Sequence, residues 1–207
     1  LPEAGVSVVE MFDKMREGEV KGFISLCNNG MVSLPDVNSI RQSLEGLEFN
    51  VNIDFLMSEA SRYADVILPG TSWAEDEGVV ASAEARVIKI NKAIEPIGDS
   101  RTDWWILCEI AKRMGREKYF KFNSPRDIFD EMRVASKGGK ADYYGMSYEK
   151  IERQNGVMWP CPTEESTGTP RMFEDFKFYL PEGKAKFHPI EYKGPKEVPD
   201  EEYPLIL

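Results

Sequence analysis

The sequence predicts an α/β fold of the doubly wound, Rossmann-like class, in which a parallel sheet carries helices on both faces. Short apolar segments typical of buried strands alternate with segments whose apolar residues recur at helical spacing. The predicted strands are residues 20–27, 49–54 and 65–68. Strands that alternate with helices in this way are connected by right-handed crossovers and form a parallel sheet that is covered on both faces.

Two helices and one shorter connection are expected around these strands. The first helix begins at Ser7, which fits a capping box with Glu10. The second begins at Pro35 and ends at Gly46, the usual places for proline and glycine in a helix. The connection over residues 55–64 is long enough for about two helical turns.

Four further elements are expected after the third strand. Residues 79–94 predict one more extended segment beside the sheet. Ser100 and Asp103 resemble a capping box that begins a helix ended by Gly115. The last two elements are helices over residues 124–138 and 148–154.

These elements predict three regions along the chain. Residues 1–116 form the α/β domain, residues 117–156 a helical extension, and residues 157–207 an extended arm rich in Pro and Gly that leads toward a further C-terminal domain. The chain opens at Leu1 without Met, and it closes on an apolar run, residues 203–207, that would leave an unpaired strand edge. We therefore expect a piece of a longer polypeptide.

Composition excludes several classes of partner. The 207 residues include 26 Lys and Arg against 36 Asp and Glu, a formal net charge of -10, without any basic run. Nucleic acid and anionic membrane surfaces are therefore not expected as partners. No apolar run approaches the ~18 residues of a membrane span, and no export signal is visible, so a cytoplasmic location is expected.

The cysteine and histidine content predicts no metal site and no nucleophilic device within the chain. Cys27, Cys108 and Cys161 stand far apart without a C-x-x-C pair, which argues against zinc or an iron–sulfur cluster and favours buried core positions. His188 is the single histidine and lies in the irregular arm. No residue is therefore predicted to be catalytic or to bind a metal.

Two features at the ends of predicted strands point to a ligand. Asp54 ends an apolar strand that leads into the predicted helical connection, and in open α/β sheets such a residue lies in the crevice where ligands bind. The turn at Asn28, Asn29 and Gly30 tolerates left-handed backbone and close approach of a ligand. Because neither G-x-G-x-x-G nor a Walker motif is present, any phosphate contact is expected at backbone amides of this turn.

A series of motifs resembles one known family. The sequences SEASRYADVILPGTSWAEDEG, SAEARV and RTDWWILCEIAKRMG resemble the third domain of the molybdopterin oxidoreductases of the dimethyl sulfoxide reductase family. The resemblance begins near Val8, stays in register to Gly115 and resumes at GVMWPCP and GKAKFHP. It implies an oxidoreductase whose full length carries bis-molybdopterin guanine dinucleotide with molybdenum or tungsten, and a 4Fe-4S cluster in an N-terminal part outside this chain.

The resemblance also implies three cofactor-binding residues. The family's contacts to the guanine dinucleotide fall on the positions of Asn29, Asp54 and Asp103. Guanine presents two adjacent N–H donors, for which a carboxylate is a natural two-point acceptor. The alternatives are a helix cap for Asp103 and a simple turn residue for Asn29.

The loop after the third strand departs from the family pattern in places. Asp76 stands where some relatives carry Lys, so a phosphate contact there is in doubt, and the acidic residues 75–77 are either a solvated loop or a hydrogen-bonded corner. Val79, Ser82 and Ala85 replace the preferred Thr, Asn and Gly. Glu84 and Arg86 match, and we expect them to form a buried pair.

Three functions from different classes remain open. The first is a piece of the catalytic subunit that supplies a guanine dinucleotide half-site, inert alone, with the remaining domains and an electron-transfer subunit or carrier as partners. VSLPD, DWWILCEIA and GVMWPCP favour a nitrate reductase, with a formate dehydrogenase as the alternative. The second is a non-catalytic α/β module that binds a nucleotide or a partner protein, and the third is a structural subunit without pterin.

Overall fold

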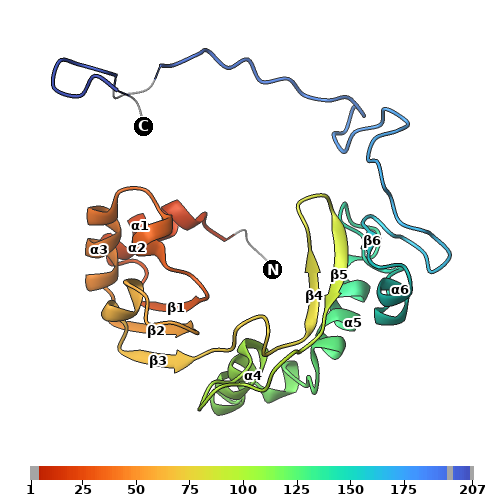
Figure 1. Cartoon of the computed structure of the whole chain (residues 1–207), viewed down its shortest axis with the longest axis horizontal. Helices are drawn as coiled ribbons and strands as arrows, with labels where there is room; N and C mark the ends of the chain where they lie inside the picture. The colour runs from red at the N-terminus through yellow and green to blue at the C-terminus, as the bar shows by residue number, and fades with distance from the viewer. Residues whose placement is uncertain (1–4, 195–197, 206–207) are drawn as a thin grey trace. The chain divides into compact units, whose positions relative to one another are not determined.

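The computed structural model describes residues 5–194 and 198–205. The chain divides into two compact units, residues 1–169 and 170–207. Every helix and strand of the described residues lies in the first unit (Figure 1).

The first unit contains a parallel three-stranded sheet, as predicted. Its strands, in spatial order, are β1 (Gly22–Leu26), β2 (Phe49–Asp54) and β3 (Val66–Pro69). In the register, Leu26 lies opposite Ile53, and Asp54 lies opposite Pro69. The carboxyl ends of the three strands therefore meet at one edge.

Helices cover both faces of this sheet, which confirms the predicted architecture. On one face, α1 (Val8–Arg16) and α3 (Val37–Glu45) form a buried core of Phe12, Met15, Ile40 and Leu44. On the other face, Ile106 of α4 (Asp103–Arg113) packs against Val51 and Ile53. β2 is buried on both sides because its residues alternate between the two faces.

The helix starts agree with the sequence in all but one case. Ser7 accepts a hydrogen bond from the Glu10 amide, over 3.2 Å, at the start of α1. The expected box of Ser100 with Asp103 is wrong, because the Ser100 hydroxyl donates to the carbonyl of Ile97 instead. The N-cap of α4 is Thr102, which makes no side-chain capping bond, so Asp103 is the first helical residue.

The connections around the sheet hold two short helices. α2 (Gly30–Ser33) follows the turn after β1, and the 3₁₀ helix η1 (Ala60–Tyr63) occupies part of the connection between β2 and β3. A further 3₁₀ helix, η2 (Glu117–Tyr119), follows α4.

A second, antiparallel sheet replaces the single extended segment that was expected beside the first. Its strands, in spatial order, are β4 (Gly78–Ala81), β5 (Arg86–Ile90) and β6 (Val157–Met158). The chain reverses between β4 and β5 because Ala85 adopts a φ of 70° and its amide donates to the Ser82 carbonyl. This turn sends residues 86–90 back along β4 rather than along the parallel sheet.

This second sheet packs against two helices, α5 (Pro125–Ser136) and α6 (Tyr148–Arg153). Their common core contains Val87, Phe129, Met146, Tyr148, Ile151, Val157 and Cys161. Segments from all three predicted regions thus meet in one core. The boundaries after residues 116 and 156 stay a prediction.

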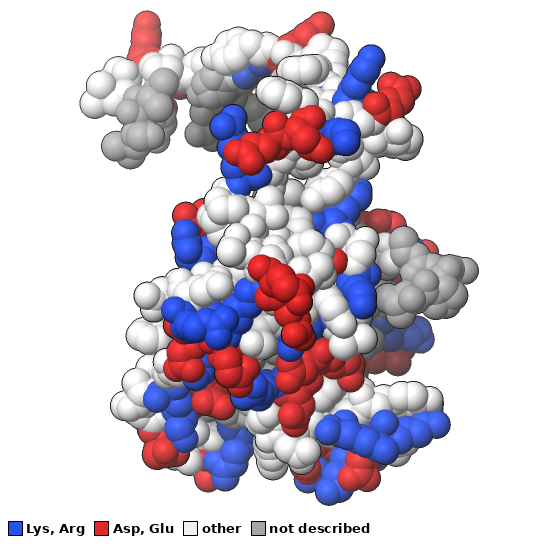
Figure 2. All heavy atoms as spheres, turned by 90° about the vertical axis from the view of Figure 1, so that its right-hand side faces the viewer, with Lys and Arg blue, Asp and Glu red and all other residues white. Residues whose placement is uncertain are grey.

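Charged side chains of both signs are interspersed on the face that Figure 2 shows. Arg126 of α5 pairs with Glu149 of α6, and Lys89 of β5 pairs with Glu152 over 3.4 Å. Within the described ranges, no helix is long and apolar enough to cross a membrane.

In the second unit, residues 170–194 and 198–205 form neither helices nor strands. Phe173 stacks on Phe178 with 4.8 Å between ring centroids. The extent of the arm, residues 157–207, stays a prediction.

Candidate functional site

The candidate site lies where the three parallel strands end and α4 begins. Cys27 follows β1, Asp54 ends β2, and Gly70 follows β3. The Arg101 amide donates to the Pro69 carbonyl over 3.0 Å, which brings the first turn of α4, with Asp103, to this edge. We call Cys27, Asp54, Gly70 and Asp103 the strand-end site.

Asp103 is the most informative residue of the strand-end site. Its Oδ2 accepts a hydrogen bond from the Cys27 thiol over 3.2 Å. Its Oδ1 is buried and has no hydrogen-bond partner. A buried carboxylate oxygen without a partner is costly, which makes this atom a candidate acceptor for a hydrogen bond from a ligand.

Asp54 lies close enough to Asp103 for their charges to interact. Burial raises the pKa of Asp103 above its ordinary value, the Cys27 hydrogen bond lowers it, and the Asp54 charge raises it further. The Oδ1 atom of Asp54 accepts a long bond of 3.4 Å from the Leu56 amide. The structure thus brings together two of the three predicted site residues, both with acceptor oxygens.

Gly70 lets the backbone after β3 lie close to the Asp103 carboxylate. A Cβ atom at this position would lie 2.6 Å from Asp103 Oδ1 and 3.7 Å from the backbone carbon of Asp54. Any larger residue would therefore displace the carboxylate. Gly70 was not predicted as a site residue from the sequence.

Asn29, the third predicted residue, contacts the protein itself. Its Nδ2 donates to Glu59 Oε2 over 2.6 Å, and its Oδ1 accepts from the Ala60 amide over 3.3 Å. The side chain thus ties the turn after β1 to the segment after β2. A contact from Asn29 to a cofactor stays a prediction.

Cys27 was missed as a site residue because all three cysteines were expected in the core. Cys161 is buried, but Cys108 is half-buried and Cys27 is exposed. Partial burial of the thiol, the hydrogen bond to Asp103 and the two nearby carboxylate charges raise the pKa of Cys27 to about 12. The signal available in the sequence was its position directly after a strand.

The acidic loop after β3 is a hydrogen-bonded corner at Glu75. Its carboxylate accepts from the Ser72 amide and hydroxyl, over 2.8 and 2.7 Å, and from the Ile97 amide over 2.7 Å. Asp76 lies nearer the strand-end site, since burial and then the Asp103 charge contribute to raising its pKa.

The pair of Glu84 and Arg86 forms, with 2.8 Å between Oε1 and Nε, but it is not buried. The two side chains are 60% and 39% exposed. The expectation of a buried pair is therefore wrong, and such an exposed pair adds little stability.

Together the fold and site define an α/β domain of the doubly wound class, with acceptor groups at the carboxyl ends of its parallel strands, which is where open α/β sheets bind ligands. Residues 3–113 match the family model described as molybdopterin oxidoreductase. The chain belongs to the molybdopterin oxidoreductase family.

Catalytic subunits of two kinds are similar to this chain. The assimilatory nitrate reductase catalytic subunit of Bacillus subtilis (strain 168) is 43% identical over 210 residues, which cover 100% of this chain and 29% of that protein. The F420-dependent formate dehydrogenase 2 subunit alpha of Methanococcus maripaludis is 38% identical over 99% of this chain and 29% of its own length. The chain thus spans about 29% of the length of these relatives.

A solved structure supports the fold. Acetylene hydratase from Pelobacter acetylenicus superposes with a TM-score of 0.58 and 22% sequence identity, covering 72% of this chain and 20% of that chain. At this level of identity the likeness concerns the fold.

The family implies a molybdenum or tungsten pterin cofactor, and the strand-end site fits part of such a group. A ligand with adjacent N–H donors would meet the unpartnered Oδ1 of Asp103 and the carboxylate of Asp54. Among the described residues, no group of three or more His, Cys, Asp and Glu could hold a metal ion.

Proposed function

We propose that this chain supplies a guanine dinucleotide half-site of a bis-molybdopterin guanine dinucleotide oxidoreductase. One observation supports this function most directly: Asp103 keeps a buried carboxylate oxygen without a partner, beside Asp54 and in front of Gly70. The cofactor would supply oxygen-atom or hydride transfer at its metal. The chain's own residues bind and orient the nucleotide end.

The proposed recognition follows from the donors of guanine. Its N1–H and N2–H groups lie side by side and need acceptors, which ionised Asp54 and Asp103 provide. Backbone amides near Asn29 and Gly30 would take the phosphates. Asn29 would also hold this turn against Glu59 and Ala60, and its contact to the cofactor is part of this proposal.

For the substrate of the complete enzyme we propose nitrate, with formate as the second candidate. The Bacillus subtilis nitrate reductase subunit is 43% identical, whereas the Methanococcus maripaludis formate dehydrogenase subunit is 38% identical. The purified enzyme that contains this chain should reduce nitrate with a reduced viologen dye. Formate oxidation without nitrate reduction would support the second candidate, and the isolated chain should do neither.

Replacement of the two carboxylates tests the half-site in the complete enzyme. Asp54→Asn and Asp103→Asn each keep the side-chain volume but set an amide donor against the guanine donors. We expect each variant to lower the guanine content per metal, at a cost of about 1–3 kcal/mol in cofactor binding. Asp99→Asn, an exposed carboxylate near α4, is the matched control.

Unchanged guanine content in both variants would reject the half-site. It would leave the alternative of a non-catalytic module that binds a partner protein. Loss of guanine in the Asp99→Asn control as well would also count against a specific role for the two carboxylates.

A further inference from the structure

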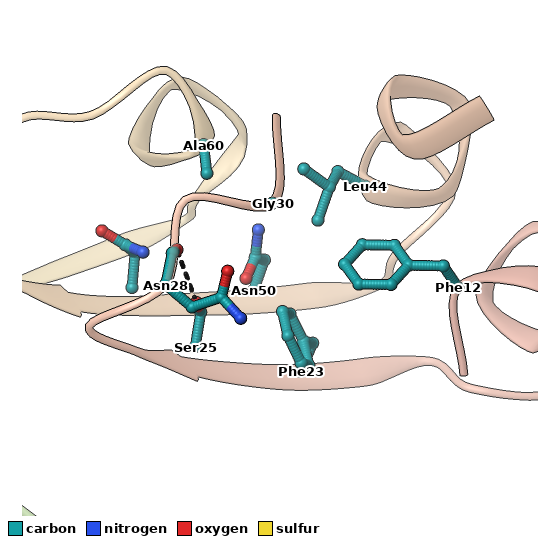
Figure 3. Close-up of a pocket in the computed structure, with 9 residues that line it drawn as sticks. Phe12, Phe23, Ser25, Asn28, Gly30, Leu44, Asn50 and Ala60 are labelled. Carbon is teal, nitrogen blue, oxygen red and sulfur yellow. Dashed lines mark hydrogen bonds between the residues drawn. The ribbon is translucent and has the colours of Figure 1, made fainter. Parts of the chain in front are cut away.

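A small cavity lies beneath the turn that follows β1. Its volume is about 10 Å³. Figure 3 shows it between the turn carrying Asn28 and Gly30, the strands β1 and β2, and Ala60. The residues that line it are Phe12, Phe23, Ser25, Asn28, Gly30, Leu44, Asn50, Asn52 and Ala60.

Two buried amides on β2 line this cavity with unmet hydrogen-bonding capacity. Asn50 and Asn52 are only 3% and 1% exposed. Asn50 donates through Nδ2 to the Tyr63 carbonyl over 3.0 Å, but its Oδ1 has no partner. Asn52 accepts at Oδ1 from the Ser61 hydroxyl over 2.9 Å, but its Nδ2 has no partner.

The two unmet groups are complementary in kind, because one is an acceptor and the other is a donor. A third polar group lies nearby, since Ser25 of β1 is opposite Asn52 in the strand register. The Ser25 hydroxyl donates its proton to the Asn28 carbonyl over 3.1 Å, so its oxygen can still accept.

We propose that this cavity is a binding site for one ordered water molecule. The water donates to Asn50 Oδ1 and to Ser25 Oγ, and it accepts from Asn52 Nδ2. Buried waters typically make about three such bonds, and a cavity of roughly 10–15 Å³ holds one water. An empty or apolar cavity would leave both buried amide groups unsatisfied, at a cost that native structures avoid.

The position of this water gives it a supporting role for the turn. Ser25 joins the water to the Asn28 carbonyl, so the water links β2 to the turn that precedes α2. The water fills the space beneath the turn and supports the turn through these hydrogen bonds. This inference does not depend on which ligand binds above the turn.

A crystal structure of the complete enzyme at about 1.8 Å or better tests the site directly. We expect a density peak within hydrogen-bonding distance of Asn50 Oδ1 and Asn52 Nδ2. An empty cavity would overturn the proposal, as would amide rotations that bond Asn50 and Asn52 directly to each other.

Substitutions of Ala60, which lines the cavity, provide a second measurement. In Ala60→Ser the hydroxyl can replace the water and its bonds, so Tm should be retained. In Ala60→Val the methyl groups displace the water and replace none of its bonds, so Tm should shift downward by more than in Ala64→Val, which measures the general cost of valine in this segment. A rise in Tm for Ala60→Val would show that a dry cavity had been filled, and would contradict the proposal.

Discussion

The Cys27 thiol donates a hydrogen bond of 3.2 Å to Asp103 Oδ2 and so joins two residues 76 positions apart in the sequence. It connects the end of β1 to the first residue of α4. The bond holds one oxygen of the carboxylate, while Oδ1 stays without a partner. The orientation of Asp103 therefore depends on Cys27, which is not itself a proposed acceptor for guanine.

The first prediction concerns the reactivity of Cys27. Although the residue is exposed, its pKa of about 12 leaves almost no thiolate at pH 8, and the thiolate is the reactive form. Alkylation by iodoacetamide should therefore be slow, and Asp103→Asn should accelerate it by removing a nearby charge. Peptide mass spectrometry measures both rates, with Asp99→Asn as the control. Fast alkylation of Cys27 in the unchanged protein would contradict the hydrogen bond between Cys27 and Asp103.

A pH dependence of stability follows from the raised pKa of Asp103. The folded state holds this proton more tightly than the unfolded state does, so the contribution of Asp103 to the free energy of unfolding is fully present below the ordinary pKa of 3.8. It is lost as pH rises through the raised pKa of the folded state. In protein without bound nucleotide, the stability of the unchanged chain relative to Asp103→Asn should fall over that window. A stability of the unchanged chain that rises with pH relative to Asp103→Asn would contradict this prediction.

Gly70→Ala should weaken the strand-end site. The added Cβ would stand 2.6 Å from Asp103 Oδ1, so the carboxylate or the turn has to move. Overpacking of this kind costs about 1–3 kcal/mol. Thermal unfolding and guanine content of the complete enzyme measure the effect. Gly5→Ala is the control, because nothing lies within 4 Å of its added Cβ. Equal unfolding temperatures and equal guanine contents for Gly70→Ala and Gly5→Ala would show that the strand-end site tolerates the displaced carboxylate, contrary to this prediction.

Lys150→Met should strongly destabilise the core that the second sheet forms with α5 and α6. Lys150 is 5% exposed, and its ammonium donates to the carbonyls of Gly145, Glu164 and Ser166. Methionine fills similar space but leaves these carbonyls without their donor, at a cost of about 3 kcal/mol or more. Chemical denaturation measures the loss, and Lys121→Met, at an exposed position, is the control. Equal stability of the two variants would show that the ammonium is dispensable.

The first half of the fold could be predicted because its signals are local. Asp54 follows an apolar segment buried on both sides, and Ser7 precedes a helix with regular apolar spacing. The place of β6 in the second sheet could not be predicted, because β6 is two residues long and pairs with β5 across about seventy intervening positions. No local pattern marks such a long-range pair.

The residues of the candidate site divide in the same way, into those with a signal in the sequence and those that depend on long-range contacts. Asp54 was predicted from its position at a strand end and Asp103 from the family resemblance, and the structure places the two close together, while their contact to a cofactor stays a prediction. Cys27 and Gly70 matter only because the fold brings them against Asp103, and neither residue type marks such a role in the sequence. Asn29 was expected to face a ligand, but its amide has partners in Glu59 and Ala60 that only the folded chain reveals.

An experimental structure of the complete, cofactor-loaded enzyme tests the central claim most directly, through the group that contacts Asp103 Oδ1. We expect a guanine ring, with its N1 and N2 atoms within hydrogen-bonding distance of the Asp54 and Asp103 carboxylates. A protein side chain or bulk solvent in contact with Asp103 Oδ1, with the guanine bound elsewhere, would contradict it.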